Sequence, residues 1–370
     1  MARPEIRIVI AGGGTGGHLY PGISLAEEIQ KRGQSEIMFV GTSYGIENQV
    51  LPDLPYTFKK VWIRGLQRKL TLANILFPLR LFVSVIQSGY FFSKFKPQAV
   101  IGTGGYVSGP ALLAALILRI PTIIQEQNSY PGLVNRTLGK WVDQIHVTYE
   151  DSLNYFKKYK KAFISGNPIR GELGNRNKIS ALQTFRLQKN KITLFIFGGS
   201  QGAHAINSVV LNCLEKALAI GELQILWATG NRDYERINRT CQNYEHRVSV
   251  HPFIYDMPSA YAVADFVVCR AGASTLSEIT ACGLPSILIP YPYATAGHQD
   301  FNAKSLEKAG AAWTVYEENL SESLLIEKIT TLVSDSQQRE SMARAARKLG
   351  KPEAAATIVD AIETLIERGQ

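Results

Sequence analysis

The chain has little cysteine and no cysteine pair at metal-binding spacing. Its 370 residues include four cysteines, none of them in a C-x-x-C arrangement. Three of the four lie in apolar surroundings, where a thiol behaves as a small hydrophobic side chain. A disulfide-stapled secreted domain and a cysteine-bound metal are therefore not expected. We predict a protein of a reducing compartment without a metal site; its cysteines are Cys213, Cys241, Cys269 and Cys282.

The first residues of the sequence do not show the pattern of a secretory leader. The first residues lead directly into a short apolar segment that ends in glycines, with no long apolar region followed by a small-residue cleavage site. We therefore expect the protein to stay in the cytoplasm.

Acidic residues are absent between Asp53 and Glu126, although the chain as a whole has a net charge of only +9. The interval holds nine basic residues and an apolar run nearly long enough to span a membrane. Pro78 and Arg80 interrupt that run at its centre, where a charge costs about 2.5 to 3.5 kcal/mol on insertion scales. A transmembrane helix is therefore not expected. The apolar residues singled out are Ile75, Leu76, Phe77, Leu79 and Phe82.

Three interpretations of this basic, apolar segment stay open. It could be a core helix with a basic outer face, or a patch that dips into a lipid interface while its cations meet anionic headgroups. Nucleic-acid binding is the weakest of the three, because no RNA- or DNA-binding motif accompanies the charge.

What the sequence does contain is one pattern used twice. Short apolar strands alternate with glycine-rich loops and helical segments, and 370 residues are enough for two domains. Parallel sheets with helices on both faces follow from that alternation, so we predict two doubly wound α/β domains facing a cleft. The expected domains are residues 1–165 and 166–350, with an amphipathic helix at 351–370. The expected strands are 7–11, 36–40, 99–101, 121–124 and 144–147, then 191–197, 223–228, 248–251, 265–269 and 286–289.

The first glycine loop follows the first strand. Gly12, Gly14 and Gly17 satisfy G-x-G-x-x-G, which suggests a dinucleotide, but the second strand ends without the acidic residue that a nicotinamide enzyme uses to hold ribose. An oxidoreductase is therefore disfavoured, and a loop for phosphate remains. His18 follows this loop; it is either a general base at neutral pH or a helix-entry residue without a role.

The second half repeats the arrangement with a glycine loop at 198–202. Further on, Thr275 and Glu278 follow a buried strand. Their spacing is that of a capping box, which needs no ligand. A carboxylate at this position can equally accept the two hydroxyls of a ribose, with Ser200 and the helix end near a diphosphate. Spacing alone does not decide between the two.

Six strings, in order between Ile8 and Ala312, resemble the MurG family of N-acetylglucosaminyltransferases. They include Gly13-Gly-Thr-Gly-Gly-His18, Glu126-Gln-Asn128 and Gly198-Gly-Ser-Gln-Gly-Ala203. The resemblance implies a GT-B architecture of two Rossmann-like domains. It also implies a hexosyltransferase that moves N-acetylglucosamine from UDP-N-acetylglucosamine to the 4-hydroxyl of the muramoyl sugar of lipid I. The product would be lipid II, for peptidoglycan synthesis, cell shape and cell division.

The resemblance also implies roles for single residues. His18 and Glu126 are the alternative catalytic groups, and Tyr106 and Asn135 lie on the acceptor side. The expected donor-binding residues are Thr15, Gly16, Gly17, Asn128, Arg170, Ser200, Ile254, Ala273, Ser274, Thr275, Leu276, Ser277, Glu278 and Gln299. One departure stands out: the family usually has histidine before this glutamate, and here the residue is Gln125, so a titratable group is missing near the expected acceptor pyrophosphate.

No Asp-x-Asp pair is present to hold a cation against the diphosphate. We therefore expect no required cofactor, with a divalent cation at most stimulatory. The expected partners are the nucleotide sugar, the polyprenyl-pyrophosphoryl acceptor, the anionic cytoplasmic face of the inner membrane and proteins of wall synthesis or division, but not nucleic acid. The rival hypotheses are a UDP-N-acetylglucosamine epimerase of the same architecture and a non-catalytic scaffold that kept the donor fold.

Overall fold

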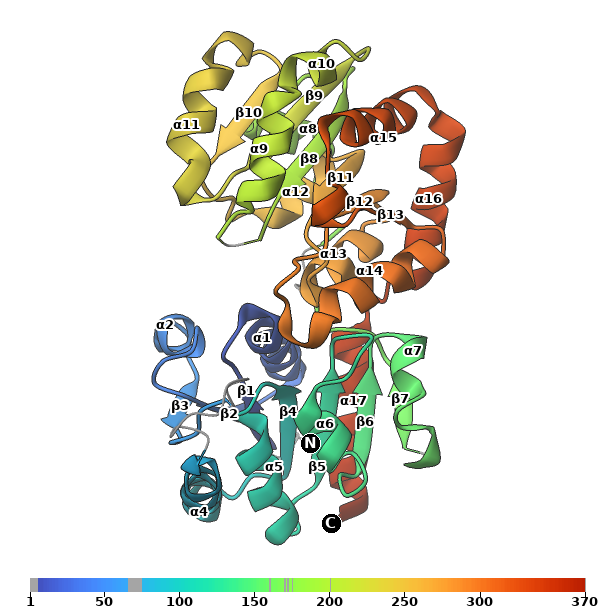
Figure 1. The fold of residues 1–370 in the computed structure, drawn as a ribbon. Coiled ribbons are helices and arrows are strands. Elements are labelled where there is room, and N and C mark those ends of the chain that lie inside the picture. The colour runs from blue at the N-terminus through green and yellow to red at the C-terminus, as the bar shows by residue number, and fades with distance from the viewer. Residues whose placement is uncertain are drawn as a thin grey trace. The chain divides into compact units, whose positions relative to one another are not determined.

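The computed structural model of the chain describes residues 6–65, 75–159, 161–169, 171, 173–174, 176–199 and 201–369. It divides into two compact units, one formed by Met1–Ile169 with Pro352–Gln370 and the other by Arg170–Lys351. Each unit is built around one parallel β-sheet (Figure 1).

The sheet of the first unit has seven strands in the order β3-β2-β1-β4-β5-β6-β7. This order reverses direction between β1 and β4, as in nucleotide-binding doubly wound folds, and ligands bind such sheets at the carboxyl ends of the strands beside that point. The five strands predicted for this half are confirmed. The short edge strands β3 and β7 were not predicted, because three or four residues with few buried apolar side chains leave little pattern. The strands are β1 (Ile6–Gly12), β2 (Ser35–Gly41), β3 (Thr57–Lys60), β4 (Ala99–Gly104), β5 (Thr122–Glu126), β6 (Gln144–Val147) and β7 (Ala162–Ile164).

Helices cover both faces of this sheet. Side chains alternate along a strand, so Ile8 and Ile10 join one apolar cluster with α1 and α17, while Val9 and Ala11 join another with α4 and α5. The helices are α1 (Gly16–Arg32), α2 (Glu47–Val50), α4 (Phe77–Phe95), α5 (Ser108–Ile117), α6 (Leu133–Leu138), α7 (Glu150–Leu153) and α17 (Ala354–Gly369), with 3-10 turns at Leu51–Asp53 and Lys157–Tyr159.

The last helix of the chain, α17, belongs to the first unit (Figure 1). Ile358 and Ile362 are fully buried in the cluster that contains α1. Arg32, in the last turn of α1, donates to Asp360 at 2.6 Å and to the Ala356 carbonyl at 3.0 Å. The chain therefore returns from the second unit to complete the core of the first.

The second unit has a six-stranded parallel sheet in the order β10-β9-β8-β11-β12-β13, which reverses between β8 and β11. The five predicted strands are confirmed, and the short β13 was not predicted. The segment 166–190 has a polar composition typical of a linker between domains, but it contains α8, which packs on α12. The strands are β8 (Ile192–Phe197), β9 (Leu223–Ala228), β10 (Val248–His251), β11 (Phe266–Cys269), β12 (Ser286–Leu288) and β13 (Ala312–Thr314).

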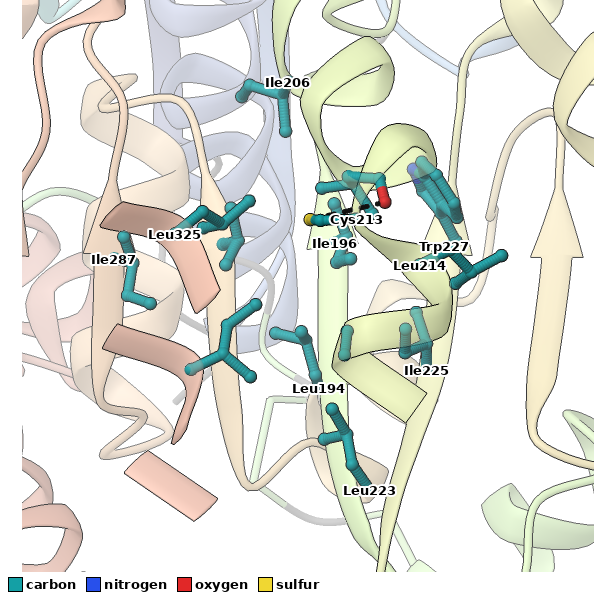
Figure 2. Packing of buried hydrophobic residues seen from close by; sticks show 14 of the residues in the cluster. Leu194, Ile196, Ile206, Cys213, Leu214, Leu223, Ile225, Trp227, Ile287 and Leu325 are labelled. Atoms are coloured by element: carbon teal, nitrogen blue, oxygen red, sulfur yellow. Dashed lines mark hydrogen bonds between the residues drawn. The ribbon is translucent and has the colours of Figure 1, made fainter. Parts of the chain in front are cut away.

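The helices of the second unit are α8 (Lys178–Thr184), α9 (His204–Asn212), α10 (Leu214–Leu218), α11 (Asn231–Cys241), α12 (Met257–Val263), α13 (Ala273–Ala281), α14 (His298–Lys308), α15 (Glu322–Ser334) and α16 (Ser336–Leu349). Figure 2 shows one side of its core, where Leu194, Ile196 and Ile225 of the sheet pack with Leu325 of α15. Cys213 lies in the same cluster, and burial raises the pKa of its thiol to about 11. Such a thiol stays protonated and acts as an apolar side chain.

Candidate active site

The first glycine loop joins β1 to α1 at the reversal point of the first sheet. Gly14 has a φ of +82°, a conformation that favours glycine. Its N–H donates to the Glu47 carboxylate at 2.8 Å, and the N–H and hydroxyl of Thr42 donate to the same carboxylate at 2.9 and 2.7 Å. Glu47 is fully buried. No local pattern predicts this contact, because the glutamate comes six residues after the end of β2 and 33 residues after Gly14.

A second glycine loop, after β4, packs directly on the first. A Cβ at Gly105 would lie 2.5 Å from the Gly13 carbonyl oxygen, and a Cβ at Gly104 would lie 2.6 Å from His18 Nδ1. Both glycines have positive φ. The Thr103 hydroxyl donates to the His18 carbonyl at 2.8 Å. Glycine is therefore required at 104 and 105 for the two loops to meet.

His18 lies in the first turn of α1, which begins at Gly16 after Thr15 in an extended conformation. Its ring is partly buried, and Nδ1 lies 3.1 Å from Oε1 of Gln127 on the loop after β5. The structure thus brings together Thr15, Gly16, Gly17 and His18 on one turn and links that turn to the segment that contains Glu126 and Asn128. Gln127 was not among the predicted site residues.

The Glu126 carboxylate accepts hydrogen bonds from the loop that follows it. One carboxylate oxygen accepts from Asn128 N at 2.9 Å and Asn128 Nδ2 at 3.3 Å, and the other accepts from Gly132 N at 2.9 Å and Asn135 Nδ2 at 2.8 Å. The side chain is 1% exposed. A buried carboxylate that accepts four hydrogen bonds is well suited to closing the loop from 128 to 135, and both of its oxygens are already engaged by that loop.

Gln125 occupies a different place from the one expected. It is fully buried at the end of β5, where its Nε2 donates to Asn167 Oδ1 at 3.2 Å. It therefore faces the interior rather than a solvent-accessible pyrophosphate site. Tyr106, on the loop after β4, is 38% exposed, and its ring lies against Gly65.

In the second unit, α13 begins directly after β11, next to the reversal point of the sheet. Gly272 is the N-cap residue of α13, so the helix has no side chain at its N-cap position. The Thr275–Glu278 capping box is therefore wrong: the helix starts at Ala273, so Thr275 lies inside its first turn, and Glu278 lies in the second. The Ser274 hydroxyl is buried and has no hydrogen-bond partner among the described residues. Free N–H groups at a helix N-terminus favour an anion.

Glu278 is nearly buried, and its Oε2 accepts a hydrogen bond from the Tyr261 hydroxyl at 2.9 Å. Burial, and then the charge of Glu278, raise the pKa of Tyr261 well above its usual value, so this phenol remains a donor. Tyr261 was not predicted as a site residue. It belongs to a helix, α12, that showed no motif.

The other residues predicted to bind the sugar donor lie away from the start of α13 in the sequence. Gln299, in the first turn of α14, accepts through Oε1 from Ala271 N at 3.1 Å and Tyr291 N at 2.9 Å, and so ties the loop before α13 to the segment after β12. Ile254 is buried between β10 and α12. Arg170 and Ser200 lie outside the described residues.

The predicted apolar patch lies on the exposed face of α4 and on the two residues that precede this helix. Ile75, Leu79 and Phe82 are 73%, 52% and 64% exposed, and Leu76 is also exposed. The prediction that Phe77 belongs to the exposed patch is wrong. Phe77 lies on the opposite side of the helix and packs against the core with Leu81 and Val85, which follow it at helical spacing. Lys94 lies 4.6 Å from the Tyr90 ring and Arg80 lies 5.5 Å from the Trp62 ring.

Two kinds of feature are absent from the described ranges. None of their helices combines the length and apolar character needed to cross a bilayer. No three of their histidine, cysteine, aspartate or glutamate side chains come together to form a metal site.

Comparisons with known proteins agree with the two-unit fold. Residues 8–147 match the glycosyltransferase family 28 N-terminal domain, and residues 193–358 match the family's C-terminal domain. A protein of Desulforamulus reducens is 40% identical over 99% of this chain and 100% of its own length; it is named UDP-N-acetylglucosamine--N-acetylmuramyl-(pentapeptide) pyrophosphoryl-undecaprenol N-acetylglucosamine transferase. A protein of Acetivibrio thermocellus with the same name is 38% identical over 98% of this chain and 99% of its own.

Two solved structures help to separate fold from activity. The crystal structure of Acinetobacter baumannii MurG has a TM-score of 0.77 and 28% identity, and covers 98% of this chain and 100% of its own. A UDP-N-acetylglucosamine 2-epimerase has a TM-score of 0.68 but only 15% identity, over 100% of this chain and 97% of its own, and so shares the fold alone. Two Rossmann-like parallel-sheet units of the GT-B class, both family 28 domains and relatives about 40% identical over full length place this chain in the MurG family of glycosyltransferases.

Proposed function

We propose that the chain is a hexosyltransferase that moves N-acetylglucosamine from UDP-N-acetylglucosamine to the 4-hydroxyl of the muramoyl sugar of lipid I, giving lipid II for peptidoglycan synthesis. The observation that carries the proposal is the full-length match, at about 40% identity, to relatives whose names state this reaction. Both glycine loops and the uncapped α13 lie at the reversal points of their sheets, where such folds bind ligands.

In the second unit, the N-terminus of α13 would receive the diphosphate of the donor. Its free N–H groups and the unpartnered Ser274 hydroxyl supply donors where negative charge grows as UDP leaves. Glu278 would accept the ribose hydroxyls, held in place by Tyr261. Gln299 has its oxygen committed to backbone N–H groups, so its Nε2 would be the atom that contacts the sugar.

The other donor contacts in the proposal come from the resemblance. Ile254 would present backbone groups to uracil, and Arg170 and Ser200 would complete the diphosphate site. Thr15, Gly16, Gly17 and Asn128 would approach the transferred sugar. Tyr106 would contact the acceptor, and Asn135 would act indirectly by holding Glu126.

His18 is the base in this proposal. The acceptor O4 attacks the anomeric carbon, the new C–O bond forms as the bond to the diphosphate breaks, and UDP leaves with the electron pair. The O4 proton passes to His18. Configuration inverts because the displacement is a single step. Glu126 is assigned the role of loop support, since its carboxylate already accepts four hydrogen bonds.

No cofactor is required in this proposal, and a divalent cation would at most stimulate the reaction. Its test is turnover after exhaustive chelation, then with magnesium restored. Retention of most of the activity after chelation supports the proposal, and loss that only metal restores contradicts it.

The outer face of α4 would place the enzyme at the cytoplasmic face of the inner membrane, next to its lipid-linked acceptor. Leu79 and Phe82 are exposed in the middle of an acid-free, basic stretch of sequence. Interfacial binding combines such an apolar face with cations near anionic headgroups. Proteins of wall synthesis or division are further candidate partners at this surface.

Vesicle flotation tests the membrane role. Leu79→Ser with Phe82→Ser should abolish binding to anionic vesicles while UDP affinity stays unchanged. Ile117→Ser, which removes an exposed apolar side chain at the C-terminal end of α5, is the matched control and should bind normally. Equal flotation of the double variant and the parent would remove the patch from the proposal.

The central experiment measures UDP release from UDP-N-acetylglucosamine with and without a lipid I analogue, with products separated by mass. Release that depends on the acceptor, with a disaccharide-lipid product, supports the transferase. Conversion of the donor without acceptor would indicate an epimerase or hydrolase, and donor binding without any turnover would indicate a scaffold.

A further inference from the structure

Gln127 connects the His18 ring to the interior of the first unit. Its Oε1 lies 3.1 Å from His18 Nδ1, and its Nε2 donates to the Thr103 carbonyl at 2.6 Å. The side chain is 1% exposed. An amide nitrogen that donates to a carbonyl leaves only the amide oxygen for the ring, and this oxygen carries no proton. The ring nitrogen that faces it must therefore be the protonated one.

A second buried amide supports this orientation. Gln125 Oε1 accepts from Gln127 Nε2, and Gln125 Nε2 donates to Asn167 Oδ1 at 3.2 Å. If the Gln127 amide were reversed, its oxygen would face both the Thr103 carbonyl and Gln125 Oε1, and both hydrogen bonds would be lost. The series of hydrogen bonds that links His18, Gln127, Gln125 and Asn167 therefore favours one orientation of the Gln127 amide.

We propose that Gln127, oriented by Gln125 and Thr103, is a positioning residue that holds neutral His18 in the tautomer with its proton on Nδ1 and its lone pair on Nε2. This inference rests on the proposed role of His18 as base. In that tautomer Nε2 takes the proton of the acceptor hydroxyl, and Nδ1 keeps its hydrogen bond to Gln127 Oε1 throughout.

Among the described residues, no carboxylate of the neighbouring loops is available to orient the His18 ring, so an uncharged amide takes this role. The carboxylates of the neighbouring loops, Glu47 and Glu126, already accept hydrogen bonds from Gly14 and Thr42 and from Asn128, Gly132 and Asn135. Gly104, with φ +103°, leaves the space that the ring and the Gln127 amide occupy. In this protein amide side chains orient the histidine ring, whereas in a catalytic triad a carboxylate orients it.

Long-range proton–nitrogen NMR correlation on the full chain with ¹⁵N-labelled histidine reads the tautomer directly, without substrate. The chain has six histidines, so His18→Ala identifies the His18 signals by difference. Above the pH at which the ring becomes neutral, the parent should show His18 protonated on Nδ1. Gln127→Met, which removes the acceptor, should move the ring towards the Nε2-protonated form and lower kcat about tenfold or more with little change in KM for the donor.

Two further variants keep the test decisive. Gln125→Met leaves the contact between Gln127 and His18 in place and should shift the His18 tautomer in the same direction by a smaller amount. This variant provides the test if the Gln127→Met protein does not fold. Gln144→Met is the matched control, because Gln144 Oε1 lies 3.2 Å from Nε2 of a different histidine, His146, in the same unit. It should perturb the His146 signals and leave those of His18 and the turnover unchanged.

The outcomes separate this inference from the proposed catalysis. A parent protein with His18 protonated on Nε2, or a Gln127→Met protein with an unchanged tautomer, overturns the positioning role whatever His18 does. The expected tautomer combined with full turnover in His18→Ala would instead remove His18 as base, while the structural relay would stand.

Discussion

The two units hold their candidate ligand loops in different ways. In the first unit, Glu47, Glu126 and Gln127 are buried side chains whose hydrogen bonds are directed to the loops themselves. In the second, α13 has no side-chain cap, and Ser274 is buried without a partner in the described part of the chain. These three side chains of the first unit are therefore engaged within its loops, whereas the start of α13 keeps a hydroxyl that is available to a ligand.

The largest expected effect is on catalysis at the first unit. His18→Ala should lower turnover by about 10²- to 10⁴-fold, the usual contribution of a general base, with UDP affinity changed by less than about twofold. Steady-state rates and calorimetric binding of UDP measure the two quantities. His246→Ala, at an exposed histidine of the second unit, is the control and should match the parent. Equal losses in turnover and UDP binding would make His18 a structural residue.

The next effect tests the internal bonding of the first unit. Glu126→Gln replaces an acceptor oxygen by an NH₂ group that faces N–H donors, so the free energy of unfolding should fall by about 3 kcal/mol. Urea denaturation measures this loss, and hydrogen exchange should locate it at residues 128–135. Glu222→Gln, at an exposed glutamate that pairs with Lys191, is the control and should leave stability nearly unchanged. A stable Glu126→Gln protein with normal exchange would show that the loop does not depend on this carboxylate.

Acid should weaken the surroundings of β6 in the first unit before those of α9 and α11 in the second. Burial lowers the pKa of His146 from 6.5 to about 4, so the folded state keeps this ring neutral. Below pH 6.5 the unfolded chain binds a proton that the folded chain does not, and stability should fall by about 3 kcal/mol between pH 6.5 and 4. This stability is fully present above pH 6.5.

In the second unit, burial would raise the pKa of Asp233, but hydrogen bonds from Asn207 and His204 outweigh it and hold that pKa below 3.8. The stability from Asp233 is present above pH 3.8 and is lost only as the pH falls through the lower folded-state value. Hydrogen exchange between pH 7 and 4 should therefore show earlier opening around β6 than around α9 and α11. Simultaneous opening would contradict this difference between the units.

The smallest effect tests the unused capacity of α13. Ser274→Ala removes a hydroxyl that has no partner among the described residues, so stability should be unchanged or slightly higher, while UDP affinity should fall by about 1 kcal/mol. Thr280→Val is the matched control: its hydroxyl lies further along α13 and donates to the Leu276 carbonyl at 2.8 Å, so its loss should leave UDP affinity unchanged. Unchanged UDP affinity in Ser274→Ala would remove this hydroxyl from the donor site.

Much of the fold could be predicted from local patterns. Ten strands were placed correctly because buried parallel strands are continuous apolar runs that end in glycine loops. The strands that were missed, β3, β7 and β13, lie at or near sheet edges and have three or four residues each. The same local patterns placed His18 and Glu278 next to the ends of buried strands.

Local spacing was less reliable where two structures share one pattern. Thr275 and Glu278 fit a capping box, but α13 begins at Ala273. Phe77 and Phe82 both belong to one apolar run, but only Phe82 faces solvent, because the core selects one side of the helix. In both cases the choice depended on where the neighbouring elements pack.

Sequence patterns alone established two doubly wound α/β halves, their glycine loops and the family motifs, because these depend on residues close together in the chain. Only the tertiary structure showed which polar groups support the loops. Gly14 meets Glu47 across 33 residues, and His18 meets Gln127 across 109. Whether a carboxylate is a base or a loop support depends on its burial and on the donors that reach it. Those donors are brought together by the packing of parallel strands whose order in the sheet differs from their order in the sequence.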